Sequence, residues 1–267
     1  MTLAQIQEIL VAARSLGTVQ SIYFEGGEPF MYYATLLQGA RLAHQMGFSV
    51  GAVSNAYWAT SLQDAFEFLK PFAGVLADLS VSSDLYHYDE MISRQAQSAS
   101  QAAESLGIAA GMISIAQPAQ AAAQSAGQLP ESESAVMFRG RAAAKLADQA
   151  PHFPWQQFDA CPHEDLREPG RVHVDAWGNL HICQGISLGN LFETPLREIC
   201  AAYDPDAHPI CGPLLAGGPA ELSRRYQVPV AEAYADACHL CYQTRRSLRE
   251  RFPSLLTPDQ MYGMIGN

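Results

Sequence analysis

The sequence has no long apolar run and few basic residues. No apolar stretch approaches the roughly 20 residues that a membrane-spanning helix needs, and the N-terminal MTLAQIQEIL has no basic residue ahead of its apolar positions, which argues against a secretory signal. Only 16 Lys and Arg stand against 27 Asp and Glu, for a formal net charge of −11. Because such a charge repels phosphate backbones and anionic bilayers, neither nucleic acid nor a membrane is an expected partner. We expect a cytoplasmic protein.

Internal repeats are also missing from the sequence, and its composition excludes a disordered chain. Hydrophobic residues make up 48% and charged residues 16% of the 267 positions, as in globular proteins. That length allows one large core, or a large domain with a small one. In a reducing cytoplasm, six cysteines are better explained as metal ligands than as disulfides.

Helix and strand patterns alternate through the first 150 residues. Thr2 and Gln5 form a capping box before a helical pattern that Gly17 ends. Further helices are expected over 31–47, 61–70 and 88–106, with another beginning near residue 141. The strands expected between the helices are VQSIYFEGG (19–27), FSVGAVSN (48–55), GVLADLSVS (74–82), IAAGMISIA (108–116) and SAVMFRG (134–140). This alternation predicts right-handed βα units around a parallel sheet.

The predicted strands end in small and polar residues. The ends read EGGEP, VSNA and DLSVSSD, and the carboxyl ends of parallel strands are where such folds bind ligands. Gly26 and Gly27 leave the backbone open to a ligand, and Glu28 can accept hydrogen bonds from an ammonium group. A tight turn with an exposed acid explains the same residues equally well.

From about residue 150 the pattern changes. An irregular, proline-rich stretch leads into RVHVDAWGNLHIC (171–183), whose alternation around Gly178 predicts a hairpin. Short helical patterns follow it. We therefore expect two domains, 1–150 and 151–267.

Four cysteines of the second part have a spacing typical of metal ligands. Cys161 precedes the predicted hairpin and Cys183 ends its second strand, while Cys238 and Cys241 form a CxxC at the start of a predicted helix. Thiolates in that number suit an iron–sulfur cluster or zinc. The sequence alone does not choose between the two metals.

The remaining cysteines and a run of arginines carry weaker indications. Cys200 and Cys211 have no close partner, and a buried small hydrophobe is the commoner role of such a residue. A place in a substrate pocket or in a second cluster is the alternative. RRSLRER (245–251) is most simply a solvated helix face near a C-terminal dipole end.

Several histidines are weaker candidates. His173 and His181 face each other on the predicted hairpin, where a surface cross-strand pair is the preferred interpretation and a role beside the metal the second. Near the predicted strand ends, His87 is a weaker candidate than Ser82 or Asp84.

Taken together, these motifs resemble the radical S-adenosylmethionine superfamily, whose core is a partial (β/α)6 barrel. FEGGEPF, VSN and DLSVSSD close successive strands as in that core, over roughly residues 1–148. The second part resembles the auxiliary-cluster extension of the superfamily, the SPASM or shorter twitch domain. That extension has a cysteine, a G-x4-C in a hairpin and a later C-x2-C. Here Cys161, Gly178-x4-Cys183 and CHLC (238–241) match in the same order.

The resemblance implies a role for each matching residue. The residues implied to bind the methionyl end of S-adenosylmethionine are Gly26, Gly27, Glu28 and Pro29. Those implied to line the cofactor or substrate side of the barrel are Ser54, Asn55, Ser80 and Ser82. Those implied to ligate one auxiliary 4Fe-4S cluster are Cys161, Cys183, Cys238 and Cys241.

One motif of the superfamily is missing. The catalytic cluster is bound there by CxxxCxxC after the first strand, and the CxxC at Cys238 would need a third cysteine where Tyr234 stands. The resemblance therefore implies a TIM-like barrel without its first strand, open beside the strand at 19–24. A small hairpin-and-helix domain would carry the auxiliary cluster. It also implies that this chain binds S-adenosylmethionine weakly or not at all.

Three functional hypotheses follow. The first is an incomplete chain of an enzyme in which a 5′-deoxyadenosyl radical abstracts hydrogen from a peptide or small-molecule substrate, with electrons from a donor such as a flavodoxin or ferredoxin. The second is a short non-catalytic relative that binds a cluster or a partner through its second domain. The third is a zinc-binding α/β protein in which GGEP is only a turn. We favour the first for the function of the fold.

Overall fold

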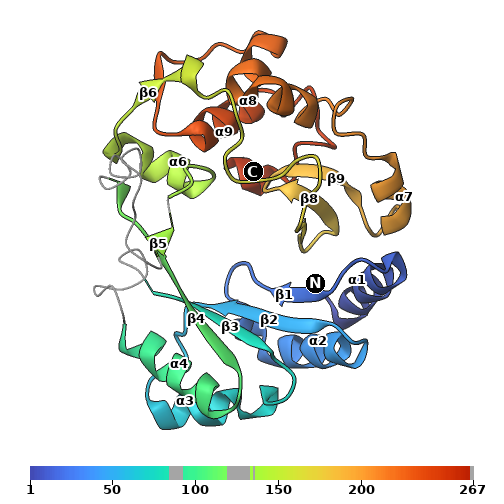
Figure 1. The fold of residues 1–267 in the computed structure, drawn as a ribbon, viewed down its shortest axis with the longest axis vertical. Coiled ribbons are helices and arrows are strands. Elements are labelled where there is room, and N and C mark those ends of the chain that lie inside the picture. The colour runs from blue at the N-terminus through green and yellow to red at the C-terminus, as the bar shows by residue number, and fades with distance from the viewer. Residues whose placement is uncertain (84–92, 119–132, 135, 265–267) are drawn as a thin grey trace. The chain divides into compact units, whose positions relative to one another are not determined.

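A computed structural model describes residues 1–83, 93–118, 133–134 and 136–264 (Figure 1). These residues fall into two compact units, one running to Gln117 and including residues 133–134, the other running from Val136 onwards. Among the described residues, no helix combines the length and the apolar character that crossing a bilayer requires.

The first unit is built on a parallel sheet. Its strands are β1 (Ser21–Phe24), β2 (Ser49–Ser54), β3 (Asp78–Ser82), β4 (Ala109–Ile115) and β5 (Glu133–Ser134). They are hydrogen-bonded in that order, and each described pair is parallel. Within the described part of the chain, β1 therefore lies at one edge of the sheet, as expected. The predicted α/β class with a parallel sheet is confirmed.

Local capping residues fix the ends of several helices in this unit. They are α1 (Leu3–Leu16), η1 (Pro29–Tyr32), α2 (Tyr33–Gln45), α3 (Leu62–Leu69), η2 (Lys70–Phe72) and α4 (Arg94–Ser105). Thr2 and Gln5 form the predicted capping box of α1, and Gly17 ends the helix at φ +85°. Ser61 and Ser93 cap α3 and α4, each by accepting a backbone N–H three residues on.

One core holds the first unit together. Figure 1 shows α1 to α4 along one face of the sheet. Leu10 from α1, Val50 from β2, Leu79 from β3 and Phe72 from η2 are buried in the same cluster. Each large apolar side chain buried in this way stabilises the fold by about 1.5–3 kcal/mol. The core fixes the strand ends on which the polar residues stand.

The second unit combines antiparallel strands with short helices. Its strands are β6 (Phe153–Pro154), β7 (His173–Val174), β8 (Asn179–Cys183), β9 (Ile186–Asn190) and β10 (Ala233–Tyr234). Its helices are α6 (Arg141–Lys145), η4 (Ala147–Gln149), η5 (Trp155–Gln157), α7 (Leu196–Ala202), α8 (Cys211–Tyr226), α9 (Ala237–Ser247) and η6 (Asp259–Tyr262). β7, β8 and β9 form one sheet, and β6 pairs with β10. The hairpin predicted over 171–183 is confirmed.

Some element bounds differ from the sequence-based expectations. The strand expected over 134–140 is wrong for residues 136–140, because the Phe138 N–H donates to Asp236 Oδ2 at 3.3 Å instead of to a strand. The helix expected over 88–106 is present as α4, and residues 84–92 lie outside the described part of the chain. β9 is an additional strand that extends the predicted hairpin.

Candidate metal centre

Glu28, one of the predicted ligand-binding residues of the first unit, is held by hydrogen bonds from within the protein. The residue is 8% exposed. Its Oε1 accepts from the Phe30 N–H at 3.0 Å and from Ser54 Oγ at 3.1 Å, and its Oε2 accepts from the Asn55 N–H at 2.7 Å. An ionised carboxylate has about four lone-pair positions, so one on Oε2 remains for a ligand. Glu28 thus ties the segment after β1 to the segment after β2.

The predicted serines lie on opposite faces of the sheet. Ser54 pairs in register with Val81, whereas Ser80 pairs with Val53. Side chains alternate along each strand and paired positions share a face, so Ser80 and Ser82 lie on the face opposite to Ser54. Ser54 is buried, and its register partner Val81 belongs to the helix-covered core. The Ser54 side chain therefore faces the helices and supports the end of β2 from that side.

The glycines at the end of β1 are required by their backbone conformation. Gly26 and Gly27 have φ of +88° and +59°, and a Cβ on either would meet nothing within 4 Å. The turn therefore needs glycine for its dihedrals and leaves the backbone open to a ligand. Pro29 is the first residue of η1. Asp84 and His87 lie outside the described residues.

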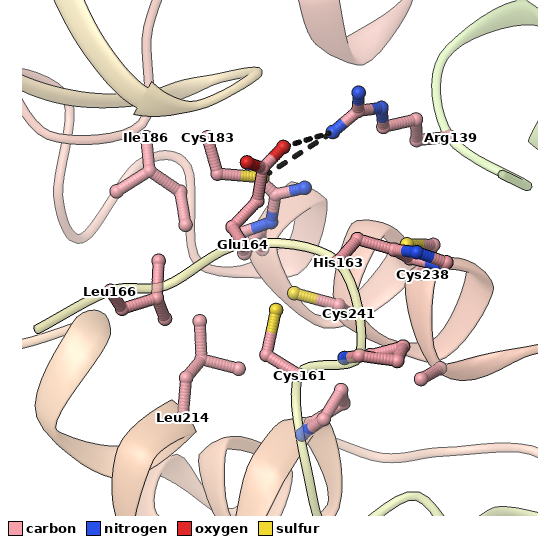
Figure 2. A pocket seen from close by; sticks show the side chains of 14 residues that line it. Arg139, Cys161, His163, Glu164, Leu166, Cys183, Ile186, Leu214, Cys238 and Cys241 are labelled. Carbon is pink, nitrogen blue, oxygen red and sulfur yellow. Dashed lines mark hydrogen bonds and ion pairs between the residues drawn. The ribbon is translucent and has the colours of Figure 1, made fainter. Parts of the chain in front are cut away.

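The predicted metal ligands of the second unit meet at one cavity (Figure 2). All four line it: Cys161, Cys183, Cys238 and Cys241. They come from three segments that are far apart in the sequence, namely a loop, the end of β8 and the start of α9. All six cysteines of the chain are free, so these thiols are available as ligands.

Helix α9 presents two of these thiols. Asp236 caps the helix, with Oδ1 accepting from the His239 N–H at 2.6 Å and Oδ2 accepting from the Phe138 N–H at 3.3 Å. Residues three positions apart share a helix face, so Cys238 and Cys241 point to the same side. The cap fixes where the first turn, and with it the CxxC, begins.

The loop before Cys161 is held against a kink in α8. Gly218 interrupts the helix with φ +62°, and a Cβ there would lie 2.3 Å from the Ala160 backbone nitrogen. Beside it, the Ala220 N–H donates to the Phe158 carbonyl at 3.0 Å. Only a glycine permits this approach, which positions Cys161 at the cavity.

Cys183 is the last residue of β8, and the hairpin turn that precedes this strand requires a glycine. Gly178 has φ +89°, and a Cβ there would lie 2.5 Å from the Phe192 ring and 2.8 Å from Asn190 Oδ1. The glycine of the G-x4-C pattern is therefore needed both for its dihedral and for its packing. The Cys183 thiol lies 3.5 Å from Arg139 Nη1.

His181 is buried, so the predicted surface pair is wrong. It lies opposite His173, as expected, but is 0% exposed. Its Nε2 lies 3.0 Å from Asp175 Oδ2, and its buried Nδ1 has no hydrogen-bond partner among the described residues. Burial opposes ionisation of Asp175, but hydrogen bonds from His181, Asn179 and Trp177 outweigh it and hold the pKa of Asp175 below its usual value. This carboxylate orients the imidazole within the hairpin.

Two arginines border the thiols. Arg139 Nη1 lies 3.7 Å from Glu164 Oε1, and both residues line the cavity. Arg245, one helical turn beyond the CxxC, lines the same cavity and is 2% exposed. The expectation that 245–251 forms a solvated face is therefore wrong for Arg245. Positive charge beside thiols favours the thiolate form.

The thiols of α9 are weak acids in the metal-free protein. Burial, followed by repulsion from Asp236 and Cys241, raises the pKa of Cys238 far above its usual value. Burial also raises the pKa of Cys241 to about 11, although Arg245 acts in the opposite direction. Because metals bind the thiolate, loading this centre must release protons.

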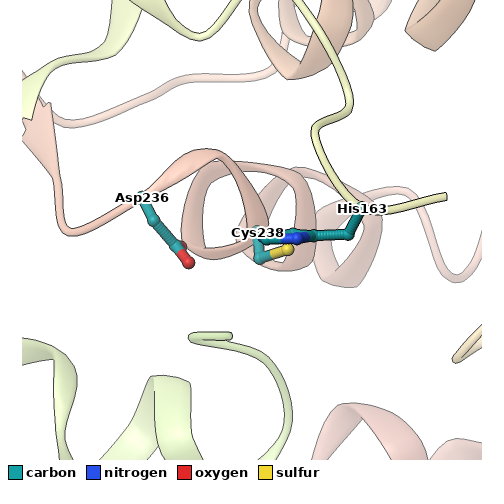
Figure 3. Close-up of side chains that lie close together, drawn as sticks. All are labelled: His163, Asp236 and Cys238. Carbon is teal, nitrogen blue, oxygen red and sulfur yellow. The ribbon is translucent and has the colours of Figure 1, made fainter. Parts of the chain in front are cut away.

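A compact group of three different ligand types lies beside the thiols (Figure 3). The ligand atoms of His163, Asp236 and Cys238 all lie within 4.8 Å of one another. Desolvation and the nearby Arg139 lower the pKa of His163, so its imidazole is neutral at pH 7 and keeps a free lone pair. Within the part of the chain that the structure describes, the four cysteine sulfurs do not form a group this compact.

Some polar residues of the centre have weaker sequence signatures than the cysteines. They are Arg139, His163, Asp236 and Arg245. His163 and Asp236 each stand two positions from a predicted ligand. Arg245 stands four positions after Cys241, a spacing that places both on one helix face. Nothing local in the sequence marks Arg139.

The other two cysteines do not line the cavity. Cys200 is exposed, so the interpretation as a buried hydrophobe is wrong for it. Cys211 begins α8 inside the core, as that interpretation predicts, and burial raises its pKa to about 12. Cys200 serves as a natural control for the four that meet at the cavity.

The donor set of the cavity defines the chemistry that it can support. Soft thiolates select iron–sulfur clusters or zinc, and guanidinium groups bind anions. The sequence matches no protein-family model and no curated protein at a significant level.

Proposed function

We propose that the second unit binds an iron–sulfur cluster through Cys161, Cys183, Cys238 and Cys241. The observation that carries the proposal is the convergence of these thiols, from three separate segments, on one cavity. A cluster bound there supplies one-electron transfer, with a reduction potential set by charge and hydrogen bonds around it.

A negatively charged occupant fits the charges of the cavity. In the described part of the chain no carboxylate lies within ion-pair distance of Arg245, and a buried charge without a counter-ion is costly. A cluster held by four thiolates carries net negative charge and offsets that cost. The four sulfurs are also spread more widely than the His163 group, which favours a cluster of several atoms over a single ion.

For the first unit we propose a partial barrel of the radical S-adenosylmethionine type. The parallel order β1–β2–β3–β4, the open backbone at Gly26 and Gly27 and the remaining acceptor position on Glu28 support it. The expected partners are a peptide or small-molecule substrate and an electron donor such as a flavodoxin or ferredoxin. We expect weak, saturable binding of S-adenosylmethionine, seen as shifts of first-unit amide signals in NMR titrations. No shifts at millimolar cofactor would contradict this part of the proposal.

A single zinc ion is the second candidate, and the compact group of His163, Asp236 and Cys238 favours it. Nitrogen, oxygen and sulfur donors in one group suit zinc. Both Asp236 oxygens, however, already accept backbone N–H groups, from His239 and Phe138, which leaves this carboxylate less free to bind zinc.

Serine substitution of each cysteine tests the proposal. Anaerobically reconstituted wild-type protein should contain iron and acid-labile sulfide and should show a broad absorption band in the visible region. Replacing any one of the four cavity cysteines by Ser should remove most of the iron, because a cluster held by fewer thiolates is easily lost. Cys200→Ser, at an exposed cysteine outside the cavity, is the control and should keep the wild-type content.

Adding His163→Ala to this panel separates the two metals. The zinc alternative predicts one zinc per chain and no sulfide. That zinc should be lost in His163→Ala and retained in Cys161→Ser, and such a result would show that the site binds zinc instead of a cluster. Iron retained after replacement of all four cavity cysteines would contradict both assignments.

A further inference from the structure

Arg245 stands in line with the two cysteines of α9. Cys238, Cys241 and Arg245 occupy positions i, i+3 and i+7, which form one stripe along a helix. All three line the cavity where the thiols meet, and Arg245 is 2% exposed. A guanidinium group is therefore enclosed in the wall of the proposed cluster site.

The guanidinium is held in place by the turn that follows Cys183. Arg245 Nη1 donates to the Gln184 carbonyl at 2.8 Å and to Tyr262 Oη at 3.3 Å. Tyr262 Oη in turn donates to the Gly185 carbonyl at 2.6 Å. A Cβ on Gly185 would lie 2.8 Å from Tyr262 Oη, so this turn has no room for a side chain. The side chain of Arg245 thus links α9, which carries Cys241, to the turn that follows Cys183.

One buried donor of Arg245 is not satisfied within the described residues. Its Nε is buried and has no hydrogen-bond partner among the described residues. Arg139, by contrast, has Glu164 within 3.7 Å. Arg245 interacts electrostatically with Cys241, Cys183 and Cys238 and with Tyr262, groups that are neutral unless they lose a proton. Among the described residues, its charge therefore lacks a permanent counter-ion in the metal-free unit.

We infer that Arg245 is the counter-ion of the cluster and raises its reduction potential. The inference rests on the proposed function and concerns a positioning residue of the same site. Reduction adds one electron from the donor to the cluster, without forming or breaking a bond, and makes the site one charge more negative. A fixed cation stabilises the reduced state more than the oxidised state, so its removal lowers the potential.

The charge and the hydrogen bonds of Arg245 can be separated by substitution. Arg245→Met removes the charge and keeps an unbranched side chain of similar reach. Arg245→Lys keeps the charge but loses the planar fork of donors. Arg246→Met is the matched control, because Arg246 is the next residue of the same helix and is exposed. Arg245→Gln, also neutral, is measured in place of the Met variant if the latter does not fold.

The deciding measurement is the midpoint potential of each reconstituted variant, from a mediated redox titration followed by EPR. We expect a more negative midpoint for the neutral variant, a midpoint closer to wild type for Arg245→Lys and no change for Arg246→Met. If the neutral variant folds but holds no cluster, cluster retention in Arg245→Lys supports the inference, and loss in both overturns it. A neutral variant that holds the cluster at the wild-type potential also overturns it.

A second readout needs no cluster. In the metal-free protein, Arg245→Met removes an uncompensated buried charge together with the hydrogen bonds to the Gln184 carbonyl and Tyr262 Oη; these effects offset each other, so we expect only a small change in the thermal unfolding midpoint. A residue with only a structural role would lower the midpoint and leave the potential unchanged, which counts against the inference. Wild type without iron and sulfide would instead refute the proposed function itself, so the two failures are distinguishable.

Discussion

Replacing Glu28 by Gln should weaken the first unit although no core side chain is removed. The Glu28 carboxylate accepts hydrogen bonds from the Phe30 N–H at 3.0 Å, Ser54 Oγ at 3.1 Å and the Asn55 N–H at 2.7 Å. Gln keeps one oxygen, but its NH2 group takes the place of the other and meets the Asn55 N–H donor to donor. Since a hydrogen bond to a charged group contributes about 1.5–3 kcal/mol, we expect a loss of about 2–3 kcal/mol for Gln and about 3–5 kcal/mol for Ala.

Urea unfolding followed by Trp58 fluorescence measures this loss. The Trp58 indole N–H donates at 3.0 Å to the same hydrogen-bond network, and replacing Trp155 and Trp177 by Phe makes the signal specific for the first unit. With a slope of about 2 kcal/mol per molar urea, Glu28→Gln should lower the midpoint by about 1 M. Glu8→Gln, at an exposed position of α1, is the control and should not move it. An unchanged midpoint in Glu28→Gln would refute the assignment of Glu28 as the tie between the two segments.

Three further predictions concern the second unit. Gly178→Ala should lower its stability by about 1–2 kcal/mol or more, from the left-handed φ and the contact with the Phe192 ring, whereas Gly170→Ala, with open space around it, should have little effect in thermal unfolding. The pKa of Asp175 is lowered in the folded state, so its ionisation stabilises the fold at pH values above the unfolded pKa of about 3.9, and this stabilisation is lost as pH falls through the folded pKa. Asp175→Asn should abolish that part of the pH dependence of the unfolding midpoint. Burial raises the pKa of Cys241 to about 11, so binding of Co²⁺ to the thiolates must release protons, and the affinity for Co²⁺ should be lower at pH 6 than at pH 8. An affinity that does not change with pH would contradict thiolate ligation.

Local features of the fold were readable from the sequence. The capping box of Thr2 and Gln5 and the stop at Gly17 involve neighbours within one helix, so their physics is local. The prediction of a strand over 134–140 fails at residues 136–140 for the opposite reason. The backbone at Phe138 bonds to Asp236, which is 98 positions away in the sequence, and no local pattern reveals that partner.

In the candidate centre, too, the features set by neighbouring residues could be predicted and those set by distant residues could not. The CxxC of Cys238 and Cys241 can be recognised from its spacing alone. The burial of Arg245 cannot, because the same run of charged residues on an isolated helix would be solvated, and only the turn at Gln184 and the ring of Tyr262 enclose it. His181 is buried for a similar reason, since its imidazole is enclosed by the hairpin that brings Asp175 to it.

The content of iron and acid-labile sulfide per chain, measured together with zinc after anaerobic reconstitution, tests the central claim most directly. A cluster held by Cys161, Cys183, Cys238 and Cys241 predicts iron and sulfide in about equal amounts, roughly four of each per chain for a 4Fe-4S cluster, and little zinc. The matched control with these four cysteines replaced by Ser should hold none of either. Zinc at one per chain with no sulfide, or iron and sulfide that survive in the four-serine variant, would contradict the account.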